Sequence, residues 1–78
     1  MENIKKYTEA FLQAFDVDES AVSSLEYESI QEWDSVGHMV LIAELEGAFD
    51  ITMEMDDIID FSGFEIGKDL LKKYDVVI

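Results

Sequence analysis

The stretch Trp33-Asp34-Ser35-Val36-Gly37-His38-Met39 joins an acidic, polar segment to the most apolar part of the chain. From Val36 to Leu45 most residues are apolar and none breaks a helix, so the pattern predicts a helix that begins at Ser35. The first residues of a helix lie beside unpaired backbone N–H groups and a partial positive charge. We therefore expect an exposed serine hydroxyl at a position that favours an attached phosphate.

The charge of the chain is strongly negative and unevenly distributed. The 78 residues include 19 acidic residues and five lysines, which gives a net charge of −14. Residues 7–67 contain 16 of the carboxylates, and the lysines lie outside this range, at Lys5, Lys6, Lys68, Lys72 and Lys73. This charge argues against nucleic acids and anionic membranes as partners. It favours protein partners with basic docking patches.

Length and composition predict one domain over residues 1–78, monomeric and cytoplasmic. No stretch approaches the roughly 20 apolar residues of a membrane helix, and the first residues lack the apolar segment of a signal peptide. The chain has no cysteine, which excludes disulfides, thiolate metal sites and a cysteine nucleophile. Any thiol chemistry would therefore require an attached group.

Apolar residues at helical spacing predict a first helix that Asn3 caps and that ends near Phe15. The residues that form its apolar stripe are Ile4, Tyr7, Phe11, Ala14 and Phe15. Residues 16–34 then form a long acidic loop with scattered apolar anchors. We expect an ordered crossover between helices that lie roughly parallel, with a short turn near residues 18–24.

The second half of the chain predicts two shorter helices. One is expected around residues 55–60, and the other follows Ser62, with Glu65 placed to complete a capping box. Gly67 is expected to allow close approach to a neighbouring helix. Together these elements predict an all-α fold, a small four-helix bundle with a long first loop and a short third helix.

The helix after Ser35 is apolar nearly all round, and Gly47 is expected to interrupt it near its end. At 100° per residue, one face carries His38 and the core residues Leu41, Ile42, Leu45, Ala48 and Phe49. A second apolar face is expected to dock partner enzymes, with carboxylates beside it for steering. The predicted docking residues are Val36, Met39, Val40, Glu44, Glu46, Asp56 and Asp57. Trp33 is expected to pack over the edge of the bundle beside Ser35.

At Asp34-Ser35-Val36 the chain resembles the acyl carrier proteins, whose signature is Asp-Ser-Leu at the head of the second helix. The resemblance covers nearly the whole chain and implies that Ser35 carries 4′-phosphopantetheine from coenzyme A, attached by a separate transferase. The terminal thiol of this group would hold acyl groups as thioesters for fatty-acid-like or specialised acyl biosynthesis. Asp34 would also help to bind the magnesium that the transferase uses. Val36, Gly37 and His38 depart from the usual residues of the family.

Other functions compete with this hypothesis. Within the same superfamily, the protein could carry aminoacyl or D-alanyl groups; outside it, the protein could be an acidic interaction module without a prosthetic group. Neither catalysis nor metal binding is expected. Asp34, Ser35 and His38 lie too close in sequence for a catalytic triad and lack a nucleophile-elbow glycine at Trp33. Residues 16–27 begin like a calcium loop but lack its glycine and glutamate.

Overall fold

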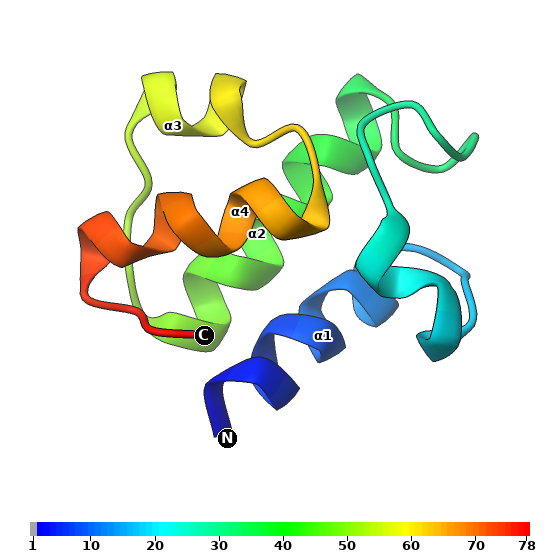
Figure 1. Ribbon diagram of the computed structural model, residues 1–78. Coiled ribbons are helices and arrows are strands. Elements are labelled where there is room, and N and C mark those ends of the chain that lie inside the picture. The colour runs from blue at the N-terminus through cyan, green and yellow to red at the C-terminus, as the bar shows by residue number, and fades with distance from the viewer. Residues whose placement is uncertain (1) are drawn as a thin grey trace.

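The computed structural model describes residues 2–78 and consists mainly of helices (Figure 1). Over these residues there are four α-helices and two short 3-10 helices: α1 (Glu2–Ala14), η1 (Glu19–Ser24), α2 (Ser35–Phe49), α3 (Met55–Asp60), α4 (Phe64–Leu71) and η2 (Lys72–Tyr74). No strand forms in this range, and one isolated bridge pairs Glu26 with Gly63. The predicted all-α class is confirmed, as are the start of the second helix at Ser35 and the bounds of the third helix.

Helices α1 and α2 pack on each other more extensively than any other pair of elements, and they run in opposite directions (Figure 1). Near the start of α1, Lys6 Nζ lies 6.0 Å from the centre of the Phe49 ring at the end of α2. Just after α1, Phe15 stacks on Trp33, two residues before α2. The prediction that the loop crosses between roughly parallel helices is therefore wrong, because the loop joins antiparallel helices. Its predicted turn is confirmed as η1.

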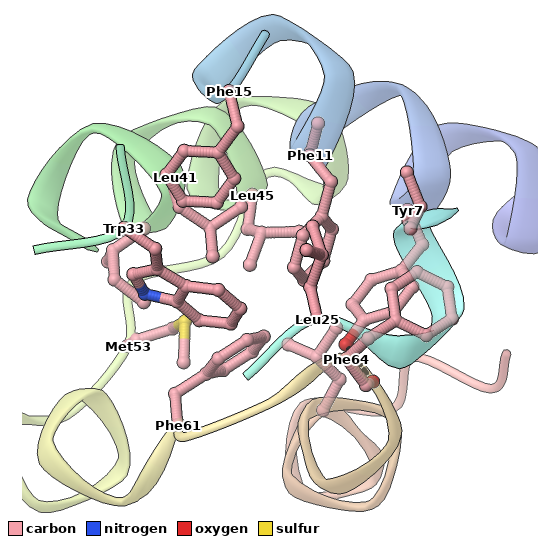
Figure 2. Close-up of a cluster of buried hydrophobic side chains, with 14 of the residues drawn as sticks. Tyr7, Phe11, Phe15, Leu25, Trp33, Leu41, Leu45, Met53, Phe61 and Phe64 are labelled. Atoms are coloured by element: carbon pink, nitrogen blue, oxygen red, sulfur yellow. Dashed lines mark hydrogen bonds between the residues drawn. The ribbon is translucent and has the colours of Figure 1, made fainter. Parts of the chain in front are cut away.

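Aromatic side chains from α1, the loop and the segments around α4 form the centre of the core (Figure 2). Trp33 is fully buried, with its ring centroid 5.2 Å from that of Phe15 and 5.7 Å from that of Phe11. The prediction that Trp33 covers the edge of the bundle is therefore wrong. The acidic loop brings the indole under α1, where two phenylalanine rings enclose it.

Helix α4 lies against α1 through a glycine contact and a buried hydrogen bond. A Cβ at Gly67 would lie 2.3 Å from both Phe61 Cζ and the Tyr7 hydroxyl, so the predicted close approach at Gly67 is confirmed. The Tyr7 hydroxyl donates a 2.6 Å hydrogen bond to the carbonyl oxygen of Phe64 (Figure 2). Burial raises the pKa of Tyr7 well above its ordinary value, so this tyrosine stays a neutral donor.

Three predictions about where helices are capped or interrupted are wrong. The N-cap of α4 is Gly63, and no side chain caps it, because the bridge to Glu26 keeps Gly63 extended and moves the helix start beyond Ser62. Helix α2 continues through Gly47 to Phe49, where Asp50 ends it in the left-handed conformation. Asn3 lies within α1, and its side-chain amide donates to the Val77 carbonyl, which holds the two ends of the chain together.

None of the helices over residues 2–78 combines the length and the apolar character that crossing a membrane requires.

Candidate functional site

Ser35 is the first residue of α2 and lies exposed at the surface, as the sequence predicts. Asp34 precedes it as the N-cap, and its Oδ1 accepts a 2.9 Å hydrogen bond from the backbone N–H of Gly37. The carbonyl oxygen of Asp34 accepts a second bond, of 2.7 Å, from the N–H of His38. These bonds fix the first turn of α2 and hold Ser35 at the helix terminus.

The loop packs so closely on the first turn of α2 that position 37 must be a glycine. A Cβ at this position would lie 1.9 Å from the carbonyl oxygen of Glu32 and 3.2 Å from a ring carbon of Phe15. No side chain fits there without movement of the backbone. The unusual glycine two residues after Ser35 therefore lets the loop approach the helix and positions Ser35 relative to Trp33.

His38 connects α2, the loop and α3 through both of its ring nitrogens. The Trp33 indole Nε1–H donates to His38 Nδ1 at 2.9 Å, and His38 Nε2 lies 2.7 Å from the carbonyl oxygen of Ile58 in α3. An indole nitrogen only donates and a carbonyl oxygen only accepts. This arrangement assigns the proton to Nε2 and leaves neither nitrogen for catalysis at Ser35.

A mainly apolar pocket of about 440 Å³ adjoins Ser35 between α2 and α3. Its lining residues are Tyr27, Ser35, His38, Met39, Met55, Ile58, Ile59, Phe61 and Ser62. A larger surface hollow of about 610 Å³ lies between residues 23–27 and the start of α4, but it does not include Ser35 and three serines and two glutamates line it. The pocket of about 440 Å³ is therefore the one that Ser35 lines. It has the size range of pockets that bind small molecules.

Exposed apolar side chains surround this pocket on α2 and α3. Val36 is 71% exposed and Met55 is 70% exposed, and Met39, Val40 and Ile59 are also exposed. Glu44 and Asp56 are exposed on the same two helices. The predicted docking residues Val36, Met39, Val40, Glu44 and Asp56 are thus all on the surface. A contiguous apolar surface of this kind is typical of interaction sites.

Two of the predicted docking carboxylates have structural partners instead. Asp57 is only 2% exposed and accepts hydrogen bonds from Lys73 Nζ, at 2.8 Å, and from the Tyr74 hydroxyl, at 2.5 Å. The bond from Lys73, together with that from Tyr74, lowers the pKa of Asp57. Glu46 accepts a 2.9 Å bond from the backbone N–H of Met53. We therefore correct the prediction for Asp57, which is not part of a docking surface, and assign Glu46 to the connection between α2 and α3.

Sequence reasoning located Ser35 and its cap but missed most of the pocket. Ile58, Ile59 and Phe61 come from α3 and the residue after it, and Tyr27 comes from the loop, so the pocket forms only when these distant segments meet α2. A helix apolar nearly all round beside a serine was the one available signal, because it showed that α2 has more apolar surface than a small core can bury. No family model, curated protein or solved structure matches this chain.

Proposed function

We propose that the protein is an acyl carrier protein in which Ser35 bears 4′-phosphopantetheine. The observation that carries this proposal is the position of Ser35, which is exposed at the start of α2 and lines an apolar pocket. A transferase requires an accessible hydroxyl, and a phosphodiester benefits from the helix terminus. The four α-helices with a long first loop and a short third helix agree with the arrangement expected of such carriers.

The helix terminus and the apolar pocket beside Ser35 suit the phosphate and the acyl chain of the prosthetic group. The phosphate would lie at the N-terminus of α2, where Asp34 caps the first turn and Ser35 is exposed. When bound, the group supplies a thiol that holds an acyl chain as a thioester. Met39, Ile58 and Ile59 offer that chain an apolar lining beside its point of attachment. A mainly apolar pocket favours acyl cargo over aminoacyl cargo, whose ammonium group would lose its hydration there.

Attachment is a simple exchange of one bond to phosphorus for another. Ser35 Oγ forms a bond to the phosphorus that carries pantetheine in coenzyme A, and the bond to the adenosine 3′,5′-bisphosphate leaving group breaks. The serine proton leaves to a base of the transferase. His38 is not available as this base, since both of its ring nitrogens are already hydrogen-bonded.

The surface formed by Val36, Met39, Val40, Met55 and Ile59 would contact the transferase and the acyl-processing enzymes. These residues are exposed on α2 and α3, and residues 7–67 contain no lysine or arginine. Apolar contact would provide affinity, and the surrounding negative field would steer basic patches towards Ser35. An interaction module without a prosthetic group would use the same surface, so only modification of Ser35 separates the two functions.

The test is the intact mass of the protein after incubation with coenzyme A, magnesium and a broad-specificity phosphopantetheinyl transferase. We expect a gain of one phosphopantetheinyl group in the wild type and in Ser62→Ala, which removes another exposed hydroxyl beside the pocket. Ser35→Ala should gain nothing. If the wild type stays unmodified while a known carrier in the same tube reacts, the carrier function is wrong and the surface must serve another kind of partner.

A further inference from the structure

Four residues with polar side chains line the pocket beside Ser35: Tyr27, Ser35, His38 and Ser62. His38 forms the inner wall, which is the side of the pocket next to the buried Trp33, and its hydrogen bonds are all internal. Trp33 Nε1–H donates to Nδ1, and Nε2–H donates to the carbonyl oxygen of Ile58. The ring also stacks on Trp33, with an interplanar angle of 16°. The imidazole is therefore fixed on two sides, whereas Met39 and Met55 elsewhere in the pocket are exposed and unbranched.

Behind His38 lies the aromatic core. Trp33 is fully buried and does not line the pocket, and it packs against Phe11 and Phe15. Phe61 lines the pocket beside His38, with the two ring centroids 6.3 Å apart. An apolar chain that extended beyond the pocket in this direction would have to displace the imidazole. That displacement would leave the buried indole N–H of Trp33 without its acceptor, which is unfavourable.

We infer that His38 is a specificity-determining residue that closes the inner wall of the pocket and limits the length of the apolar acyl chain that the pocket accepts. The inference deepens the proposed function and rests on it, because the cargo reaches the pocket from Ser35. A buried methylene improves binding about fourfold. The affinity should stop rising with chain length once the apolar chain extends to the imidazole of His38.

The experiment titrates the unmodified 78-residue protein with neutral straight-chain alcohols from butanol to decanol and follows the binding by NMR. Neutral probes avoid repulsion by the net charge of −14. In the wild type we expect the affinity to rise about fourfold per methylene for the shorter alcohols and then to level off. The indole N–H resonance of Trp33 should stay unchanged throughout, because its bond to His38 is retained.

Two variants of His38 test the role of its hydrogen bonds. His38→Ala opens the inner wall, so the rise in affinity should continue to longer alcohols and the Trp33 indole resonance should shift. His38→Gln is the conservative control, because its amide oxygen can accept from Trp33 while its amide nitrogen donates to Ile58. It should restore the limit on chain length.

The inference is overturned if wild-type affinity keeps rising to decanol with a shift of the indole resonance, if His38→Ala has the same limit as the wild type, or if no alcohol binds. If His38→Ala does not fold, the wild-type titration alone tests the inference. Because no prosthetic group is needed, this result is independent of the mass experiment. A limit on chain length without modification of Ser35 would contradict only the carrier function.

Discussion

Gly37 shows how a single residue sets the position of the first turn of α2, where Ser35 lies. A Cβ at this position would lie 1.9 Å from the carbonyl oxygen of Glu32, so Gly37→Ala forces the loop or the first turn of α2 to move. We expect this substitution to lower the free energy of unfolding by about 1–3 kcal/mol, the usual cost of overpacking. Urea denaturation followed by circular dichroism measures the change.

Gly47 provides a matched control within the same helix. It is exposed, and a Cβ there would meet no atom within 4 Å. Gly47→Ala should therefore raise the free energy of unfolding by roughly 0.5–1 kcal/mol, because alanine favours the helical conformation. Equal effects of the two substitutions would contradict the packing that we assign to Gly37.

The sequence was sufficient to predict single residues whose roles depend on near neighbours in the chain. Ser35 and Asp34 define a helix start within a few residues, and both lie where we expected them. The roles of Gly37 and His38 depend on partners that the pattern could not place. Glu32 approaches Gly37 only because the loop folds back, and His38 reaches Ile58, twenty residues away in the sequence. Asp57 was misplaced for the same reason, since Lys73 and Tyr74 come from the end of the chain.

At the scale of elements, α3 is attached to the rest of the molecule by polar contacts as well as by Ile58, which packs against the core. It has only six residues, and its pocket-lining residues Met55 and Ile59 are exposed. The Tyr74 hydroxyl accepts a 2.8 Å bond from the N–H of Glu54 and donates to Asp57, which also pairs with Lys73. The bounds of α3 were predictable from its acidic and apolar pattern, whereas the bonds that fix it against η2 were not.

These bonds predict a pH dependence for the attachment of α3. The hydrogen bond from Lys73 lowers the pKa of Asp57 in the folded protein below its unfolded value of about 3.9. The Asp57 carboxylate therefore binds a proton less readily in the folded state than in the unfolded state. Asp57 therefore stabilises the folded state at pH values above its unfolded pKa. This stabilisation is lost as the pH falls through the lower pKa of the folded state. We expect Asp57→Asn to destabilise the protein at pH 7.

The difference in unfolding free energy between wild type and Asp57→Asn should shrink as the pH falls below about 4. Urea denaturation at a series of pH values measures it. Asp56→Asn, at the exposed neighbouring position in α3, serves as the control and should show a much smaller effect at neutral pH. A constant difference between wild type and Asp57→Asn down to the lowest pH would contradict the ionic attachment of α3.

At the scale of the whole molecule, negative charge dominates and is only locally compensated. Lys68, Lys72 and Lys73 pair with Glu65, Asp69 and Asp57, so most of the other carboxylates have no lysine beside them. Mutual repulsion of these carboxylates opposes the compact state, and salt screens it. We expect the melting temperature to rise as sodium chloride increases from about 0.01 to 0.5 M, most steeply at the low concentrations where the Debye length changes most.

The same charge should have the opposite salt dependence when a partner binds. Screening weakens steering towards a basic patch, so the association rate with a phosphopantetheinyl transferase should fall over the salt range in which the melting temperature rises. Replacing Glu44 and Asp56 by Gln and Asn should slow association at low salt while slightly raising the melting temperature. If salt changed stability and association in the same direction, repulsion among the carboxylates would not be the common cause. Opposite changes would mean that the chain gives up stability for a field that directs enzymes to Ser35.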